Sequence, residues 1–283
     1  MQGLMMDFPL TITSIMEHAE RVHGAQEIVS VTRDNPRHRY TYSDSFARVR
    51  QLANAMNGWG LSQSDRIATL AWNDYRHFET YYASACSGYV CHTINPRLFP
   101  EQIVYIINHA EDQYVFLDPD FWPLIEQVAP QCPGVKGWVV MTTPEHMPET
   151  SVATVHCYEH LLEGQADTYI WPTVDENDAC ALCYTSGTTG DPKGVMIKHV
   201  SIVTGASYCA GLEMFATDRY LSYLPLAHIF ETVVMNFCLF SGAAIGFYQG
   251  DTLKILEDLQ ALRPTFFVSV PRLYNRIHDK IIG

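Results

Sequence analysis

One loop constrains the possible folds of this chain more than any other segment. It occupies residues 184–194 and directly follows an apolar run, 179–184, that has the length and composition of a buried strand. From Thr185 to Gly194 the loop holds three glycines, three threonines, one serine and Lys193. Glycines let backbone N–H groups turn toward one anion, the hydroxyls add donors, and Lys193 adds a positive charge. The sequence therefore predicts a triphosphate-binding loop between a buried strand and a following helix.

The loop does not match the Walker A pattern GxxxxGK[ST]. Counted from Gly187, the sixth position is Pro192 rather than glycine, and Gly194 rather than serine or threonine follows Lys193. A P-loop NTPase is therefore disfavoured. Composition alone leaves a flexible glycine- and threonine-rich surface loop as the alternative.

Strand-like and helical segments alternate along the rest of the chain. A helix capped by Ser43 has an apolar face from Phe46 to Met56, Asp251 is expected to cap another helix, and Pro271 is expected to start a last one. The remaining expected elements are strands at 67–72, 114–117, 137–141, 243–248 and 265–270, helices at 75–87 and 100–109, and a surface loop at 142–154. This order predicts an α/β fold with parallel sheets flanked by helices, and a subdomain break near 171–178.

The formal charge of the chain is -13 at pH 7. An acidic chain disfavours nucleic acid as a partner and electrostatic docking on an anionic membrane, so any polyanion must be held by a local site. The eight cysteines are scattered through apolar segments, which is typical of reduced thiols in a cytoplasmic protein. Peripheral membrane association and a homodimer stay open.

Two segments have alternative interpretations. Cys180 and Cys183 have CxxC spacing, but no second pair or histidine cluster stands at zinc-finger spacing, so a buried strand is favoured over a metal or redox site. Residues 232–250 carry no formal charge, yet they contain Asn236, Gln249 and three glycines. A core helix followed by a buried strand is therefore favoured over an integral membrane span.

The string TSGTTGDPKG at 185–194 resembles the signature loop of the adenylate-forming, or AMP-binding, superfamily, which includes acyl-CoA synthetases, luciferases and peptide-synthetase adenylation domains. Further likeness lies at 92–97 and 223–231. Residues 1 to about 190 resemble bacterial short- and medium-chain acyl-CoA ligases, including the methylmercaptopropionate type. From Gly190 onward, notably at 250–254 and 263–272, the chain resembles long-chain fatty-acyl ligases.

The resemblance implies a two-step reaction. A carboxylate, here a fatty acid, attacks the α-phosphorus of ATP to give an acyl-adenylate, and coenzyme A then displaces AMP. It implies that Lys193 and the loop hold the β- and γ-phosphates, that Thr185 lies close to Mg²⁺, and that His228 lies beside the acyl carboxylate. The loop positions that the resemblance assigns to ATP are Thr185, Ser186, Gly187, Thr188, Thr189, Gly190 and Lys193. A lone histidine such as His228 is otherwise more often a core residue, and Glu231 is expected to be an ion-pair or capping residue.

Several features of the superfamily have no counterpart in the sequence. The Tyr-Gly-x-Thr-Glu segment, the aspartate that holds the ribose and the C-terminal lid lysine do not occur among the 283 residues. We therefore expect residues 1–283 to be a truncated N-terminal adenylation domain that lacks the lid and does not turn over alone. A non-catalytic nucleotide-binding module and an aryl-CoA ligase or peptide-synthetase domain remain alternatives.

Overall fold

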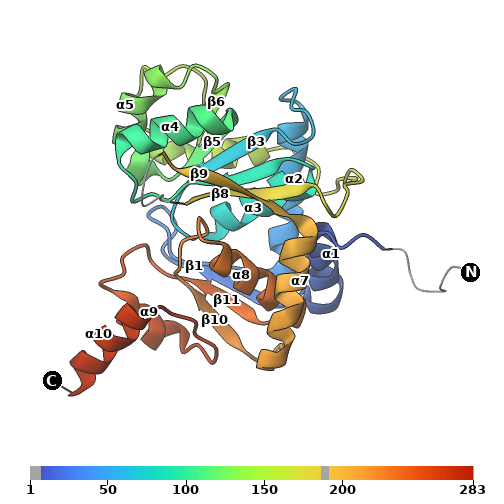
Figure 1. Cartoon of the computed structure of the whole chain (residues 1–283), viewed down its shortest axis with the longest axis vertical. Helices are drawn as coiled ribbons and strands as arrows, with labels where there is room; N and C mark the ends of the chain where they lie inside the picture. The colour runs from blue at the N-terminus through green and yellow to red at the C-terminus, as the bar shows by residue number, and fades with distance from the viewer. Residues whose placement is uncertain (1–7, 186–190, 283) are drawn as a thin grey trace, which may run out of the picture.

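The computed structural model describes residues 8–185 and 191–282, which form two β-sheets and the helices that cover them (Figure 1). The strands are β1 (Glu27–Ser30), β2 (His38–Thr41), β3 (Arg66–Leu70), β4 (Val90–Thr93), β5 (Asp112–Leu117), β6 (Gly137–Val140), β7 (Val155–Cys157), β8 (Ala179–Thr185), β9 (Lys193–Lys198), β10 (Arg219–Ser222) and β11 (Ala244–Phe247). The α-helices are α1 (Ile12–His23), α2 (Tyr42–Asn57), α3 (Tyr75–Cys86), α4 (Pro100–Ala110), α5 (Trp122–Val128), α6 (Tyr158–Leu162), α7 (His199–Tyr208), α8 (Ile229–Ser241), α9 (Ile255–Leu262) and α10 (Pro271–Ile282).

The larger sheet has seven strands in the order β7-β6-β5-β3-β4-β8-β9. All neighbouring strands run parallel except β8 and β9, which form an antiparallel hairpin at one edge. The strands β3, β4 and β5 are almost entirely buried, as expected where helices cover both faces of a parallel sheet. The expected strands at 67–72, 114–117 and 137–141 are confirmed as β3, β5 and β6.

The smaller sheet has four strands in the order β10-β11-β1-β2. The strand β1 pairs in parallel with β11, although more than 200 residues of chain separate their registered partners Ile28 and Ile245. β11 also pairs in parallel with β10, and β2 returns antiparallel to β1. The expected α/β class with parallel sheets flanked by helices is therefore confirmed.

Helices fill the space between the two sheets (Figure 1). One continuous core cluster joins Phe78 of α3 and Met235 of α8 to Ile67 of the larger sheet and Ile245 of the smaller one. The outer face of the larger sheet is covered by α4 and α5, which bury a second cluster around Ile103. A third, smaller cluster lies where α9 packs on the smaller sheet. Apolar burial of this kind is the main source of stability in such a layered fold.

Local signals explain where the helices begin. Thr41 caps α2 and forms a reciprocal capping box with Asp44, so the cap lies two residues before the expected Ser43. Asp74 caps α3 by accepting a hydrogen bond from the backbone N–H of His77. Pro100 opens α4 as its first residue, where its missing N–H costs no helical hydrogen bond.

The uncharged segment 232–250 forms most of α8 and all of β11, as the helix-and-strand interpretation predicts. Its side chains Met235, Leu239 and Ile245 are buried in the core cluster. Within the described part of the chain, every helix is too short or too polar to cross a membrane.

The expected strand at 265–270 is wrong. Only Phe266 bridges to Tyr220 of β10, and the rest of the segment is irregular. Pro264 and Pro271, on either side of the segment, lack a backbone donor and so disfavour a regular ladder there. The helix expected from Asp251 begins later, at Ile255, because Asp251 instead accepts hydrogen bonds from Leu253 and Lys254 in a turn.

Candidate functional site

The loop predicted to bind phosphate connects the two strands of the hairpin β8–β9. Thr185 stands at the end of β8 and is in register with Lys193 at the start of β9. Both residues are exposed, and the Thr185 hydroxyl donates to the Lys193 carbonyl at 3.5 Å. Ser186, Gly187, Thr188, Thr189 and Gly190 lie outside the described residues. The two ends of the loop are therefore anchored side by side on paired strands.

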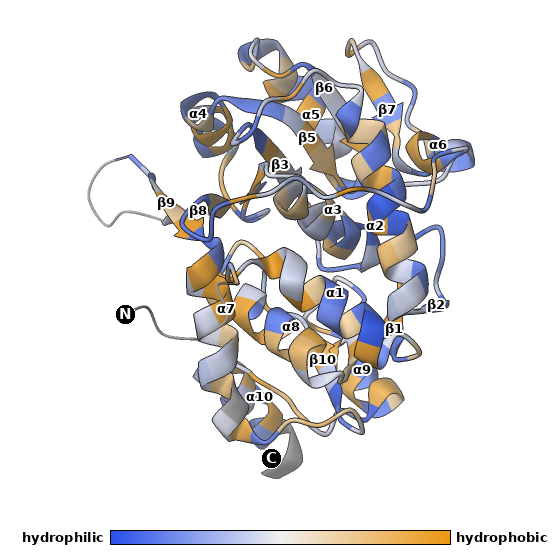
Figure 2. Ribbon diagram, turned by 90° about the vertical axis from the view of Figure 1, so that its right-hand side faces the viewer, coloured by the Kyte–Doolittle hydropathy of each residue, from blue (hydrophilic) through white to orange (hydrophobic). Residues whose placement is uncertain are grey.

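The expected passage from this loop directly into a helix is wrong. Residues Lys193–Lys198 first form β9, and α7 begins only at His199. The strand was missed because only Ile197 of β9 is buried, so its hydrophobic residues do not reveal one core-facing side. Figure 2 shows hydrophobic residues on this hairpin, and the side chain of Met196 is 76% exposed.

His228 is an exposed residue at the start of α8. It is the N-cap of the helix, and its Nδ1 accepts a hydrogen bond from the backbone N–H of Phe230 at 3.4 Å. The core interpretation of this histidine is therefore wrong. Its imidazole is accessible to a ligand at the positive end of the dipole of α8.

The segment that precedes His228 is held against the larger sheet. Thr93, at the end of β4, donates to the carbonyl of Leu226 at 3.1 Å and lies 3.5 Å from Sγ of Cys183 in β8. The amide of Asn73 donates to the carbonyl of Leu224 at 2.7 Å. Thr93 thus joins the strand that leads into the phosphate loop to the segment that leads to His228. In the described residues, no hydrogen bond or ion pair links Thr185 or Lys193 directly to His228.

Glu231 is fully buried in the first turn of α8. Its carboxyl accepts hydrogen bonds from the hydroxyls of Tyr220 at 2.7 Å and Ser222 at 2.5 Å. Burial raises the pKa of Glu231 to about 7, although both hydroxyls act in the opposite direction. The expected ion-pair or capping role is wrong, because the partners are neutral side chains of β10.

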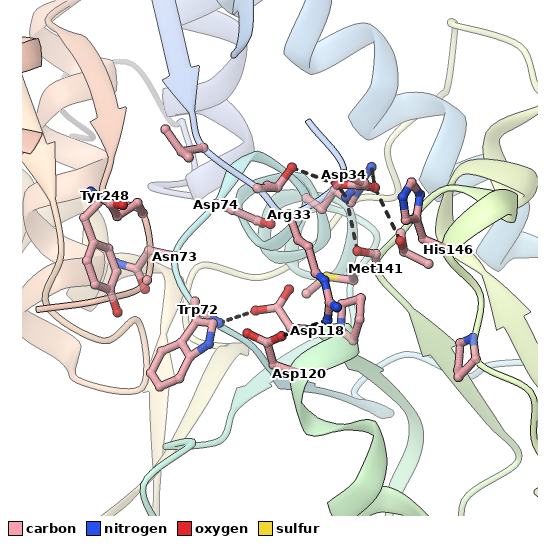
Figure 3. A pocket seen from close by; sticks show the side chains of 18 residues that line it. Arg33, Asp34, Trp72, Asn73, Asp74, Asp118, Asp120, Met141, His146 and Tyr248 are labelled. Carbon is pink, nitrogen blue, oxygen red and sulfur yellow. Dashed lines mark hydrogen bonds and ion pairs between the residues drawn. The ribbon is translucent and has the colours of Figure 1, made fainter. Parts of the chain in front are cut away.

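A separate cleft of about 520 Å³ opens between the two sheets (Figure 3). Its walls come from the segments that follow β1, β3, β5, β6 and β11. The lining residues are Val31, Thr32, Arg33, Asp34, Trp72, Asn73, Asp74, Arg76, Asp118, Pro119, Asp120, Met141, Thr142, His146, Pro148, Tyr248, Gln249 and Gly250. Ligands of open α/β sheets commonly bind outside the carboxyl ends of strands, which is where this cleft lies. Thr185, Lys193 and His228 do not line it.

The cleft holds one buried ion pair and two buried carboxyls. The guanidinium of Arg76 lies 2.8 Å from the carboxylate of Asp34. Burial alone would raise the pKa of Asp34, but the hydrogen bond and charge of Arg76 outweigh it and lower that pKa to about 2. Burial raises the pKa of Asp74 to about 6. Burial and the neighbouring Asp74 raise the pKa of Asp118 well above its usual range.

Sequence reasoning missed Asp74 and Asp118. One signal was present, because both follow apolar strands of a parallel sheet within a few residues, where polar side chains collect at the carboxyl edge. Asp118 accepts a hydrogen bond from the backbone N–H of Trp72 at 2.6 Å and so joins the ends of β3 and β5. The described residues contain no group of three or more His, Cys, Asp or Glu side chains arranged to hold a metal ion.

Comparison with known proteins gives consistent matches. The family described as AMP-binding enzyme matches residues 16–281. A medium-chain-fatty-acid–CoA ligase of Ectopseudomonas oleovorans is 47% identical over 232 residues, which are 81% of this chain and 42% of the relative. A 3-methylmercaptopropionyl-CoA ligase of Ruegeria lacuscaerulensis is 42% identical over 282 residues, covering 97% of this chain and 52% of the relative. The chain thus spans about half the length of these curated relatives.

Solved structures show the same fold. A long-chain-fatty-acid–CoA ligase of Archaeoglobus fulgidus superposes with a TM-score of 0.84 at 18% identity, over 98% of this chain and 55% of that chain. The anthranilate CoA ligase AuaEII, solved in complex with anthranoyl-AMP, superposes with a TM-score of 0.83 at 22% identity, over 95% of this chain and 51% of that chain.

Proposed function

The chain belongs to the AMP-binding enzyme family, and from this we propose that it supplies the ATP phosphate-binding part of an acyl-activating ligase. The reaction is attack of a carboxylate on the α-phosphorus of ATP, followed by transfer of the acyl group to coenzyme A. The hairpin β8–β9 carries the proposal, because it places the hydroxyl of Thr185 and the charge of Lys193 at the two ends of a glycine- and threonine-rich loop.

The chain's own contribution to the first step is charge neutralisation and positioning. Negative charge accumulates on the leaving pyrophosphate, and a fixed ammonium group stabilises it more in the transition state than in bound ATP. Lys193 makes no ion pair in the described residues, so its ammonium group is available to the phosphates. The glycine-rich segment 186–190 is proposed to add backbone N–H donors and the hydroxyls of Ser186, Thr188 and Thr189.

Mg²⁺ is proposed to accompany the nucleotide. Magnesium prefers oxygen ligands and is held by waters and substrate phosphates together with a few protein oxygens, which in some nucleotide sites include a serine or threonine hydroxyl. The exposed hydroxyl of Thr185 fits this pattern as a single neutral oxygen donor. When bound, the ion neutralises phosphate charge, and Thr185 orients the triphosphate relative to Lys193.

A fatty acid is the proposed carboxylate substrate, because the relatives are named as medium-chain and long-chain fatty-acid–CoA ligases. His228 is proposed to lie beside the carboxylate, at the exposed N-terminus of α8, where the helix dipole favours an anion. A cytoplasmic location is proposed because all eight cysteines are free thiols, which is typical of proteins in reducing compartments.

A second candidate is nucleotide binding without turnover. The chain spans about half the length of its relatives, and the Tyr-Gly-x-Thr-Glu segment that the superfamily uses near Mg²⁺ does not occur in its sequence. In this case the chain binds ATP phosphates but forms no acyl-adenylate.

Carboxylate-dependent ATP–pyrophosphate exchange, measured beside MgATP binding, tests whether this chain carries out the first step or only binds the nucleotide. Exchange that requires a fatty acid supports the complete first step in this chain. MgATP binding without exchange, which we expect for residues 1–283 alone, supports a phosphate-binding part that needs further segments for chemistry. Absence of both binding and exchange overturns both candidates.

A further inference from the structure

Tyr184 is partly buried in β8, directly before the exposed Thr185, and it contacts three different elements. We propose that Tyr184 is a positioning residue: it ties the β8–β9 hairpin to α4 and thereby fixes where Thr185 and Lys193 stand on either side of the loop. The inference rests on the proposed role of this loop in phosphate binding.

The first contact reaches helix α4. The hydroxyl of Tyr184 lies 2.6 Å from Nδ1 of His109, in hydrogen-bond contact. His109 is in the last turn of α4, and its ring stacks on that of Tyr105 one turn earlier, with centroids 5.3 Å apart. This hydrogen bond thus connects the edge hairpin β8–β9 to α4, a helix that packs on the same sheet.

The second contact crosses the hairpin. Tyr184 and Gly194 are registered partners on β8 and β9. A methyl group placed on Gly194 would lie 3.2 Å from Cζ of Tyr184 and 3.1 Å from Cδ1 of Leu182. The tyrosine ring therefore occupies the space beside the backbone of Gly194, which any larger residue would need. Since Gly194 directly follows Lys193, the ring fixes the course of the chain that carries the lysine.

The third contact is to a buried, hydrogen-bonded pair. The ring of Tyr184 lies 5.0 Å from the ring of His92, centroid to centroid. Nδ1 of His92 lies 2.8 Å from the Asp112 carboxylate, and both side chains are fully buried. His92 is a residue of β4 and Asp112 begins β5, so this pair belongs to the interior of the sheet.

These contacts constrain the hairpin at one point, beside the exposed ends of its two strands. On each strand the next residue toward the loop, Thr185 or Lys193, is exposed. A binding group is most effective when supporting side chains hold its backbone close to the productive geometry before the ligand arrives. Tyr184 meets this requirement for both ends of the loop, because it adjoins Thr185 on β8 and pairs with Gly194, which follows Lys193 on β9.

The test measures the affinity of the 283-residue chain for inorganic pyrophosphate by calorimetric titration. Tyr184→Phe keeps the ring and removes the hydroxyl, and His109→Ala removes the partner. Each variant should bind about two- to tenfold more weakly, the usual effect of one net hydrogen bond. The double variant should bind no more weakly than either single variant, because both remove the same contact. Tyr208→Phe, an exposed tyrosine of α7, is the matched control and should bind normally.

Hydrogen exchange of peptides covering residues 191–198 provides a readout without ligand. Exchange should be faster in Tyr184→Phe than in the original chain, with an unchanged thermal midpoint. The inference is overturned if Tyr184→Phe and the original chain have equal pyrophosphate affinities and equal exchange rates. It is also overturned if the affinity losses of the two single variants add up fully in the double variant. If the original chain itself binds no pyrophosphate, the proposed function fails, and the exchange rates alone decide whether Tyr184 positions the hairpin.

Discussion

The carboxylate of Glu79 accepts a hydrogen bond from Nε of Arg48 at 2.8 Å, in the helical layer between the two sheets. The same carboxylate accepts hydrogen bonds from the hydroxyls of Tyr40 at 3.0 Å and Tyr158 at 2.7 Å. Glu79 itself is fully buried, and its partners come from β2, α2 and α6. One side chain of α3 therefore joins three other elements.

Replacing Glu79 with alanine should destabilise the fold strongly. The change leaves Nε of Arg48 and two hydroxyls without their acceptor, while Glu159 still pairs with the other two nitrogens of Arg48. Breaking a buried pair from one side costs about 3–5 kcal/mol. Denaturant unfolding measures the loss. Glu27→Ala is the control, since Glu27 forms an exposed ion pair with Arg39, and such pairs contribute less than about 1 kcal/mol. Equal losses in both variants would contradict the role of Glu79.

Glu231→Gln should change how stability depends on pH. Burial raises the pKa of Glu231 from 4.5 to about 7, so the folded state holds the proton more tightly than the unfolded state. The stability linked to this proton is fully present below pH 4.5 and is lost as pH rises toward 7. Glutamine keeps the shape and cannot ionise. As pH rises through this range, the unfolding free energy of the variant should therefore increase by about 3 kcal/mol relative to that of the original chain. If the difference between the two unfolding free energies does not change with pH, the raised pKa of Glu231 is contradicted.

Gly242→Ala should destabilise the end of α8. Gly242 has φ of 74°, a left-handed conformation that costs an L-residue about 1–2 kcal/mol. An added methyl group would also clash with the imidazole of His23 in α1. Gly134→Ala is the control, because its added methyl group meets nothing within 4 Å. The melting temperature should fall for Gly242→Ala and stay unchanged for Gly134→Ala. The reverse order would refute the packing argument.

His228→Ala and His228→Asn separate two effects at the start of α8. Asparagine retains an N-cap acceptor, whereas alanine removes it at a cost of about 0.5–2 kcal/mol. If the imidazole contacts the acyl carboxylate, both variants should weaken fatty-acid binding equally, while only alanine lowers the melting temperature. Unchanged fatty-acid affinity in both variants would reduce His228 to a helix cap.

The sequence predicts the layered α/β architecture well because alternating apolar runs and capped amphipathic segments are local features. It predicts β3, α3, α4 and β5 within a few residues for this reason. It does not predict β9, whose hydrophobic residues remain largely exposed on an edge strand. Residues 265–270 are apolar enough for a strand but find only one partner at Tyr220.

The candidate site is only partly readable from the sequence. The loop is recognisable because its composition is unusual, and His228 because a family motif surrounds it. The cleft is not recognisable, since Asp34, Asp74 and Asp118 come from three distant segments that meet only when β1, β3 and β5 are assembled. The support that His109 gives to Tyr184 is invisible for the same reason, because 75 residues separate them.

Titration of the chain with MgATP tests the central claim most directly when Lys193→Ala is compared with Lys136→Ala. Lys136 is an exposed lysine outside the hairpin, so both variants lose the same charge. The account predicts that the original chain and Lys136→Ala bind MgATP equally. Lys193→Ala should bind MgATP at least about tenfold more weakly, which is the effect of losing one charge-assisted hydrogen bond. Equal binding by Lys193→Ala and the original chain would contradict the assignment of this hairpin to the ATP phosphates.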